Sequence, residues 1–276
     1  MNTSSLFATD LDGTLIRSDG SFSYEDLNSL RRLGESGCTV VLASGRSPFS
    51  LERCLAGRKL PVDWYVLSSG AGILNPEGAV HISHSLSENE TLEIHRAFTA
   101  LGIEDISIQS PFPYTHRLNW IPGNHGKDFI TRLDLYRGHS RKIDSACISA
   151  SEVIGFVAPE YAEDTIARLH DVLGRRFSII RATSPLDNTT VWVEVFPHGV
   201  SKASGCEYIR RELGINRENT SAIGNDWNDI HMLDWAAVSF VVENTPEELS
   251  SRYTRVPSND DHGVMTAAGI WLEMIS

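Results

Sequence analysis

The stretch from Leu6 to Leu15 constrains the fold of this chain more than any other, because an apolar run stops there at two aspartates and a glycine, Asp10-Leu11-Asp12-Gly13. A short apolar run of this kind predicts a buried β-strand. Open parallel α/β sheets bind their ligands at the carboxyl edge of the strands. If the extended geometry continues, side chains two residues apart lie on one face, which places Asp10 and Asp12 about 6 to 7 Å apart.

The carboxylates of Asp10 and Asp12 repel each other when they share one face. A shared proton or a hard divalent cation with oxygen ligands relieves this repulsion, and Mg²⁺ is the first expectation. A simple turn, in which the aspartates accept hydrogen bonds from nearby backbone N–H groups, is the alternative. An EF-hand calcium loop is excluded, because Leu15 stands where that loop requires glycine. The glycine-rich nucleotide-binding fingerprints are also missing from the sequence.

Charge and cysteine content narrow the class of protein. The 276 residues include 36 acids against 24 Lys and Arg, and the formal charge of −12 argues against a nucleic-acid or membrane-surface partner. Any phosphate site must therefore supply local positive charge. The cysteines have no metal-type spacing, the N-terminus is too polar for a signal peptide, and no apolar run approaches membrane-spanning length. We therefore expect a soluble protein in a reducing, cytoplasmic setting.

Strands and helices alternate along the first part of the chain. The pattern predicts a helix over 21–37, a strand over 39–43, a helix over 48–60 and a strand over 64–67. This alternation implies a parallel sheet covered on both faces. The second strand ends at Ser44-Gly45-Arg46, whose hydroxyl, backbone N–H groups and guanidinium are suited to hold a phosphate. The same tripeptide is also common in plain turns.

The order of the predicted elements changes between residues 84 and 188, where two successive units of a helix followed by strands are predicted. This pattern indicates an inserted α+β domain with an antiparallel sheet, within a body formed by residues 1–83 and 189–276. The strand over 190–196 suits either part. An insert of this kind can act as a lid that selects the substrate. Candidate contacts are His116, Arg117, Asn119 and Trp120, although polar residues are routine on exposed strands.

The body resumes with Lys202 in the first turn of a predicted helix, where the helix dipole disfavours a cation unless an anion lies nearby. A fourth buried strand, Ser221-Ala222-Ile223, then ends at Gly224-Asn225-Asp226-Trp227-Asn228-Asp229. The oxygen atoms of these side chains suit Mg²⁺, and a helix N-cap at Asn228 or Asp229 is the simpler alternative. A fifth strand is predicted over 238–242.

In their order and spacing, four of these motifs resemble those of the haloacid dehalogenase superfamily: Asp10-Leu11-Asp12-Gly13-Thr14, Ser44, Lys202 and Gly224-Asn225-Asp226-Trp227-Asn228-Asp229. The insertion after the third strand resembles the Cof-type branch, which also holds sucrose-phosphate phosphatases and carries a C2-type cap. The resemblance implies a Rossmann-like core with a doubly wound parallel sheet. It covers residues 1–83 and 189–276, whereas the insert matches only in size and coarse pattern.

The resemblance also implies a function: a Mg²⁺-dependent phosphatase that hydrolyses a small phosphorylated metabolite, such as a sugar phosphate, through an aspartyl phosphate. Asp10 would be the nucleophile, and Asp12 would protonate the leaving alcohol and then activate water. The phosphate would be bound by Ser44, Gly45, Arg46 and Lys202. The metal would be held by Asp10, Asp12 through its backbone carbonyl, and the motif after the fourth strand, from which the candidates are Asn225, Asp226 and Asp229.

The motif after the fourth strand departs from the family pattern, which is usually Gly-Asp-x-x-Asn-Asp. Here Asn225 follows the glycine and Asp226 comes one position later. An amide oxygen can bind Mg²⁺ but brings no formal charge, so we expect Asn225 to be a weaker ligand, with Asp229 orienting the site or capping the helix. Two other functions stay open: a phosphomutase or phosphotransferase, and a non-catalytic ligand-binding member of the fold. The presence of Asp10 and Asp12 argues against the last.

Overall fold

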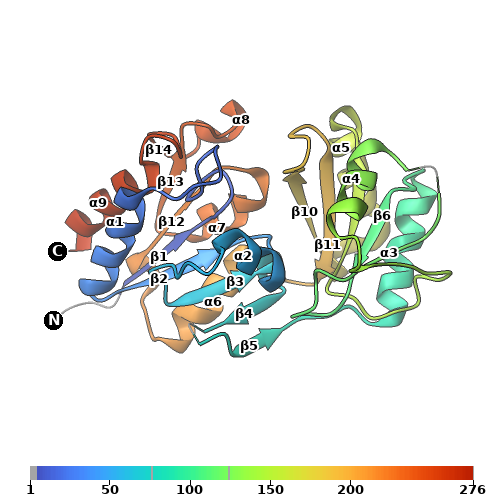
Figure 1. Cartoon of the computed structure of the whole chain (residues 1–276), viewed down its shortest axis with the longest axis horizontal. Coiled ribbons are helices and arrows are strands. Elements are labelled where there is room, and N and C mark those ends of the chain that lie inside the picture. The colour runs from blue at the N-terminus through green and yellow to red at the C-terminus, as the bar shows by residue number, and fades with distance from the viewer. Residues whose placement is uncertain (1–4, 76, 124, 276) are drawn as a thin grey trace. The chain divides into compact units, whose positions relative to one another are not determined.

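The computed structural model describes residues 5–75, 77–123 and 125–275, which form two compact units (Figure 1). The first, here called the core, comprises Met1–Arg46, Cys54–Ile82 and Ser201–Ser276. The second, here called the insert, comprises Ser47–Arg53 and Ser83–Val200.

The core is built on a sheet with the strand order β14-β13-β12-β1-β2-β3-β4-β5. Its strands are β1 (Ser5–Thr9), β2 (Cys38–Ala43), β3 (Trp64–Leu67), β4 (Gly72–Leu74), β5 (Val80–Ser83), β12 (Thr220–Gly224), β13 (Val238–Val242) and β14 (Thr254–Val256). Neighbours from β14 to β3 are parallel, and β4 returns antiparallel to β3. The carboxyl ends of the parallel strands therefore meet at one edge of the sheet.

Both faces of the core sheet are apolar and buried. Leu6 and Ala8 of β1 and Val41 of β2 form one cluster with residues of the helices that follow the insert. Phe7 and Val40 point to the opposite face by strand periodicity and are equally buried. The helices that lie wholly in the core are α1 (Tyr24–Glu35), α6 (Lys202–Glu212), α7 (Ile230–Trp235), α8 (Glu247–Ser250) and α9 (Gly263–Ile275), whereas α2 (Pro48–Leu55) is divided between the two units.

The helices lie in pairs along the core sheet. Helices α1 and α9 pack together; α1 lies against β2, and α9 lies against β1, β12, β13 and β14 (Figure 1). Helices α6 and α7 form the second pair; α6 lies against β2 and β3, and α7 lies against β12 and β13. This arrangement confirms the predicted α/β class with a doubly wound parallel sheet. The short strands β4, β5 and β14 were not predicted, because runs of three or four residues carry too little periodicity to be recognised.

The insert contains a second sheet with the order β10-β11-β9-β6-β7-β8. Its elements are α3 (Glu88–Ala100), β6 (Ile106–Gln109), β7 (Leu118–Trp120), α4 (Lys127–Leu135), β8 (Ser140–Lys142), β9 (Glu152–Val157), α5 (Pro159–Leu173), β10 (Phe177–Thr183) and β11 (Val191–Pro197). Helices α3 and α5 cover one face around Phe98 and Ile108. On the other face, Phe129 of α4 packs with Phe156 and Trp192. The paired strands are antiparallel except for β7 and β8.

Two boundaries between the units differ from the predicted ones. Strand β11 pairs with β9 and β10, so the chain leaves the insert only after Val200 and not at residue 188. The apolar run of β11 suits either sheet, which is why its sequence does not show where it belongs. The segment Ser47–Arg53 also groups with the insert, although it follows β2 directly. A boundary that falls inside a helix leaves no signal in composition.

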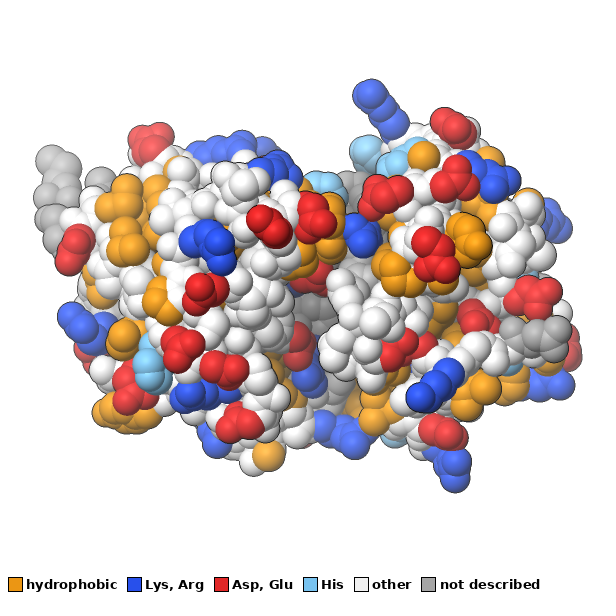
Figure 2. All heavy atoms as spheres, turned by 90° about the horizontal axis from the view of Figure 1, so that it is seen from above, with side chains coloured by type: hydrophobic (Ala, Val, Ile, Leu, Met, Phe, Trp, Pro, Cys, Tyr) orange, Lys and Arg blue, Asp and Glu red, His pale blue; other side chains and the backbone are white. Residues whose placement is uncertain are grey.

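The surface is mixed in charge. Figure 2 shows one face on which acidic and basic side chains are interspersed among polar and hydrophobic ones. Among the described residues, no helix combines the length and the apolar character needed to cross a membrane.

Candidate active site

Strand β1 delivers the two motif aspartates to the carboxyl edge of the core sheet. The backbone N–H of Asp10 donates to the carbonyl of Ile223 at 3.0 Å, which extends the pairing of β1 with β12 by one residue. The chain then makes a tight turn, in which the N–H groups of Leu15 and Ile16 both donate to the carbonyl of Leu11. Gly13 has φ +74°, and a Cβ there would lie 2.5 Å from Nδ2 of Asn225. This turn therefore requires glycine.

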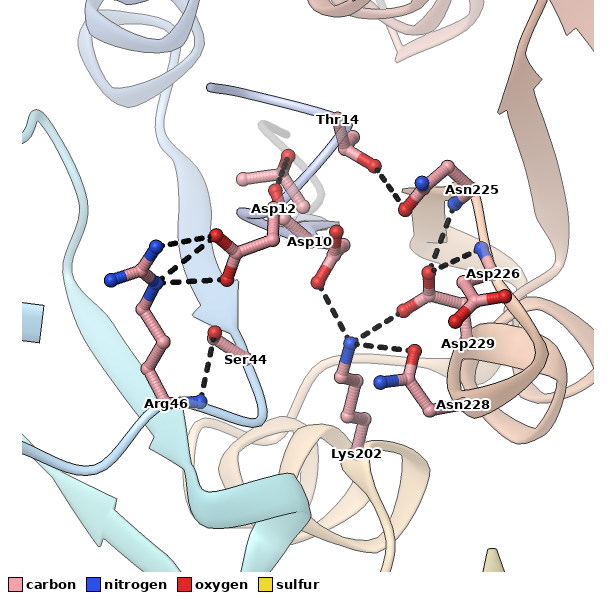
Figure 3. A network of polar contacts seen from close by, with 11 residues as sticks. Asp10, Asp12, Thr14, Ser44, Arg46, Lys202, Asn225, Asp226, Asn228 and Asp229 are labelled. Carbon is pink, nitrogen blue, oxygen red and sulfur yellow. Dashed lines mark hydrogen bonds and ion pairs between the residues drawn. The ribbon is translucent and has the colours of Figure 1, made fainter. Parts of the chain in front are cut away.

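Lys202 lies at the centre of the site (Figure 3). Its ammonium nitrogen Nζ donates to Oδ1 of Asp10 and to Oδ1 of Asp229, both at 2.7 Å, and to Oδ1 of Asn228 at 3.3 Å. The side chain of Lys202 is 1% exposed and that of Asp229 is fully buried. Because a buried lysine is stable only when it is paired, this arrangement ties the start of α6 to β1 and to the turn after β12.

A close backbone approach brings the start of α6 to this position. A Cβ on Gly70, which has φ +104°, would lie 2.2 Å from the carbonyl oxygen of Ser201. Only glycine allows the turn after β3 to touch the residue before Lys202. Ser201 caps α6, since its Oγ accepts from the N–H of Ser204 at 3.1 Å.

The charges at Lys202 do not balance, and the pKa values reflect this. Burial raises the pKa of Asp10 to about 7; the neighbouring charge of Asp229 adds to the rise, and Lys202 opposes it. For Lys202, burial acts to lower the pKa, but Asp10 and Asp229 together raise it above its ordinary value. One ammonium faces two carboxylates, so the lysine stays charged while one carboxylate is left with an uncompensated cost. A further positive charge or an added proton would relieve that cost.

The carboxylates of Asp229 and Asp226 are engaged in hydrogen bonds within the protein. Oδ2 of Asp229 accepts from the N–H groups of Asn225 at 2.9 Å and Asp226 at 3.1 Å, while Oδ1 accepts from Lys202. The side chain of Asp226 caps the short turn Trp227–Asp229 by accepting from the backbone N–H of Asp229. This geometry favours an orienting role for Asp229 and a capping role for Asp226.

Asn225 reaches toward Asp10 and Asp12. One terminal atom of its amide lies 3.0 Å from the main-chain oxygen of Asp12, 3.3 Å from Oδ2 of Asp10 and 3.2 Å from Oγ1 of Thr14. An amide nitrogen at this position donates to all three oxygens. An amide oxygen there instead accepts from the hydroxyl of Thr14 and faces the main-chain oxygen of Asp12 and Oδ2 of Asp10. A bound cation would stabilise these three facing oxygens.

These donors fit Mg²⁺, which is commonly held by one or two carboxylates, several waters and the phosphate of a substrate. Asp10 offers a carboxylate oxygen, Asp12 a main-chain carbonyl and Asn225 an amide oxygen. Within the described residues no cluster of three His, Cys, Asp or Glu side chains is suited to a metal ion. The donor set here is mixed in kind, with a single carboxylate.

Arg46 holds the carboxylate of Asp12. Its Nη2 donates to Oδ1 at 2.7 Å and its Nε to Oδ2 at 2.9 Å, so both carboxylate oxygens are occupied. The side chains of Arg46 and Asp12 are 31% and 42% exposed, in contrast to the buried Lys202. Ser44 is buried, and its Oγ accepts from the N–H of Arg46 at 3.1 Å, with Gly45 between them. Figure 3 shows Asp12, Ser44 and Arg46 on one side of Asp10, and Lys202 with its partners on the other.

The structure therefore brings the core motifs together in one polar network. Sequence reasoning missed the contact of Asn228 with Lys202 and that of Thr14 with Asn225, although both residues lie inside the quoted motifs. The four candidates of the insert contact other residues of the insert. Asn119 donates to the carbonyl of Ile108, Arg117 lies over the ring of Tyr114, His116 stacks on Phe49, and Trp120 packs edge-on against His125.

Comparison with known protein families identifies the class. The sequence profile of the haloacid dehalogenase-like hydrolases matches residues 7–267, so the chain belongs to that family. This match confirms the predicted superfamily and the prediction of a hydrolytic enzyme.

Individual relatives agree over nearly the whole length. Phosphatase YwpJ of Bacillus subtilis is 24% identical over 282 residues, covering 94% of this chain and 96% of that protein. A second protein of Bacillus subtilis, 5-amino-6-(5-phospho-D-ribitylamino)uracil phosphatase YitU, is 25% identical and covers 94% of both chains. Among solved structures, that of the subclass IIB sugar phosphatase BT4131 has the same fold, with a TM-score of 0.75, 18% identity and coverage of 99% and 100%.

Proposed function

We propose that this protein is a Mg²⁺-dependent phosphatase that hydrolyses the phosphate monoester of a small hydroxylated metabolite through an aspartyl phosphate. The observation that carries the proposal is the buried carboxylate of Asp10, held at 2.7 Å by the fixed positive charge of Lys202 and followed two residues later by the half-exposed carboxylate of Asp12. The names of the relatives support the reaction class, and two of them act on esters of a sugar or a phosphoribityl group.

In the first half of the proposed reaction, a carboxylate oxygen of Asp10 attacks phosphorus. A bond forms between that oxygen and phosphorus as the bond from phosphorus to the leaving oxygen breaks, and Asp12 gives its proton to the leaving oxygen. The products are an alcohol and an aspartyl phosphate. The charge of Lys202 and the hydroxyl of Ser44 stabilise the negative charge on the transferring group.

In the second half, water attacks phosphorus and the carboxylate of Asp12 takes its proton. The bond between Asp10 and phosphorus breaks, inorganic phosphate leaves, and both aspartates return to their starting states. Arg46 donates to both oxygens of Asp12 in the structure, so at least one of these contacts must be released when Asp12 acts as an acid. We propose that Arg46 then turns to the phosphate or the leaving group, with Gly45 leaving room beside Ser44.

Asp10, the carbonyl of Asp12 and the amide of Asn225 would hold Mg²⁺. When bound, the ion neutralises charge between the carboxylates and the phosphate. Because Asn225 is neutral, this chain binds the ion with one negative charge fewer than a relative that has aspartate there, and we expect lower affinity. We further propose that the insert selects the leaving group, as a C2-type cap does.

The test measures inorganic phosphate released from a panel of sugar phosphates, sugar-alcohol phosphates and p-nitrophenyl phosphate, in Mg²⁺ or EDTA. We expect Mg²⁺-dependent release by the wild type, none by Asp10→Asn, and an unchanged rate for Asp234→Asn, which alters an exposed aspartate paired with Arg252. Release without an added acceptor alcohol would also exclude an obligate phosphotransferase. Folded wild type that releases no phosphate across the panel would refute the proposal.

A further inference from the structure

We propose that Asn259 and Asn244 are positioning residues that fix the loop carrying Asp12, an inference that rests on the proposed function. Asn259 lies in the loop between β14 and α9, and Asn244 follows β13. Neither residue belongs to the motifs that define the site. Both lie in loops at the carboxyl ends of strands on the same side of β1 in the sheet.

The loop that follows Asp12 is organised around Ile16. The N–H of Ile16 donates to the carbonyl of Leu11 at 2.8 Å, and Ile16 forms isolated bridges with Asp12 and with Phe22. A displacement of Ile16 would therefore move the turn that contains Asp12 and Gly13.

Asn259 binds the main-chain carbonyl of Ile16. Its Nδ2 donates to the carbonyl of Ile16 at 2.8 Å, and the residue is 4% exposed. Its backbone N–H donates to Oδ1 of Asn244 at 3.2 Å, and Nδ2 of Asn244 donates to the carbonyl of Gly13 at 2.8 Å. These three hydrogen bonds form one continuous path from Ile16 through the two asparagines to Gly13. At position 244 the path needs a side chain that donates and accepts at once, which asparagine provides and aspartate or alanine does not.

The neighbouring residue adds a second anchor on the same loop. Asp260 accepts from the N–H of Ser18 at 2.9 Å and from its Oγ at 2.7 Å. The segment that makes these contacts is itself held, because the N–H groups of Asp261 and Gly263 both donate to the carbonyl of Ser258. The turn before α9 is thus a fixed support for the loop after β1.

The support from Asn244 affects the proposed reaction because the carbonyl that it holds, that of Gly13, is next along the chain to the carbonyl of Asp12. Asn244 holds the carbonyl of Gly13, which fixes the orientation of the chain that carries the carbonyl and the side chain of Asp12. In the proposed function the carbonyl of Asp12 holds the cation and the side chain of Asp12 transfers the proton. A displacement of about 1 Å in such a group costs roughly a hundredfold in rate.

The test compares Asn259→Ala and Asn244→Ala with a matched control, Asn75→Ala. The side chain of Asn75 accepts from the N–H of Ala79 at 2.8 Å in a surface turn of the core, away from the motif loops. Asn244 is exposed, so its variant is expected to fold even if Asn259→Ala does not. Rates are measured with a sugar phosphate and with p-nitrophenyl phosphate, whose leaving group departs without a proton.

We expect kcat for the sugar phosphate to fall roughly ten- to a hundredfold in the two variants, with KM near the wild-type value. The loss should be smaller for p-nitrophenyl phosphate, because proton donation by Asp12 matters less there, and Asn75→Ala should match the wild type. An equal loss on both substrates, or no loss, would overturn the inference, since a purely structural role does not distinguish leaving groups.

Hydrogen exchange gives a readout that does not depend on turnover. In Asn259→Ala, or in Asn244→Ala if the first variant does not fold, the amides of Thr14, Leu15 and Ile16 should exchange faster than in the wild type, and those of the α3 helix should not. If the wild type hydrolyses no ester, the proposed function fails while this measurement still decides whether the asparagines hold the loop. Unchanged exchange at Thr14, Leu15 and Ile16 would reject the positioning role.

Discussion

Replacing the buried Asp10 by asparagine should make the metal-free protein more stable. Asp10 and Asp229 share one ammonium, that of Lys202, so removing one negative charge leaves a balanced pair. The amide oxygen of an asparagine can still accept from Lys202. The stability that the wild type gives up at this position is a cost of keeping a reactive carboxylate in a buried place.

The size of the effect follows from the pKa of Asp10, which rises from 3.8 to about 7 on folding. Between these two values the folded protein holds a proton that the unfolded chain has lost, so stability falls as pH rises through this window and is constant above it. At about 1.4 kcal/mol per pKa unit, the ionised group costs at most about 4 kcal/mol at pH 8. Relaxation and entry of water reduce this, and we expect Asp10→Asn to gain about 1 to 3 kcal/mol.

The assay is thermal and urea unfolding in EDTA, as a function of pH. Asp10→Asn should be more stable than the wild type at pH 8 by several degrees, and the gain should vanish near pH 4. Lys202→Met is the contrasting variant: it leaves two buried carboxylates without the positive charge that they share and should lose about 3 to 5 kcal/mol. A less stable Asp10→Asn at pH 8 in EDTA would refute this account of the charge balance.

Three further predictions concern single side chains. Asn225→Asp should lower Tm in EDTA, because it brings a second carboxylate toward Asp10. The same variant should show a larger rise in Tm on addition of Mg²⁺ than the wild type. An unchanged rise in Tm with Mg²⁺ would contradict a ligand role for residue 225. Cys147 is exposed and should react with a thiol reagent in the folded protein, whereas burial raises the pKa of Cys206 to about 12, so that labelling of Cys206 should follow unfolding. Hydrogen bonds, chiefly from Arg210, lower the pKa of Glu207 to about 2. Glu207→Gln should therefore lower the free energy of unfolding by about 1 kcal/mol at pH 7, after allowance for solvent screening. This difference should disappear as pH falls from 4.5 to 2. Equal unfolding free energies of Glu207→Gln and wild type at pH 7 would contradict the last prediction.

The central strands of the core could be predicted because each combines an apolar run with an abrupt polar end. That combination identified β1, β2, β3 and β12 and placed Asp10 and Ser44 near one sheet edge, whereas Lys202 was recognised as a cation in the first turn of a predicted helix. The short outer strands β4, β5 and β14 lack the length that makes a pattern recognisable. The assignment of β11 to the insert depends on which strands it pairs with, and its own residues do not carry that information.

The detailed chemistry of the site depended on contacts between distant segments. Sequence alone left the choice between Asn225 and Asp226 open; in the structure the amide of Asn225 lies 3.0 Å from the main-chain oxygen of Asp12, whereas the side chain of Asp226 caps the following turn. The support from Asn244 and Asn259 could not be foreseen either. Their hydrogen-bond partners, Gly13 and Ile16, lie more than two hundred residues earlier, and only the neighbouring positions of the strand ends bring them together.

The discontinuous core has a consequence for biosynthesis. Asp10 is made early, but its partner Lys202 follows 192 residues later, after the whole of the insert. Most of the insert is continuous in sequence and can fold as it leaves the ribosome, whereas β1 must wait for β12 with one edge unpaired. During synthesis the apolar strands β1 to β3 are therefore exposed for as long as it takes to translate the insert, and a chaperone that binds extended apolar segments would act in that interval. A nascent chain arrested before Lys202 would carry Asp10 without the positive charge that holds it in the folded protein.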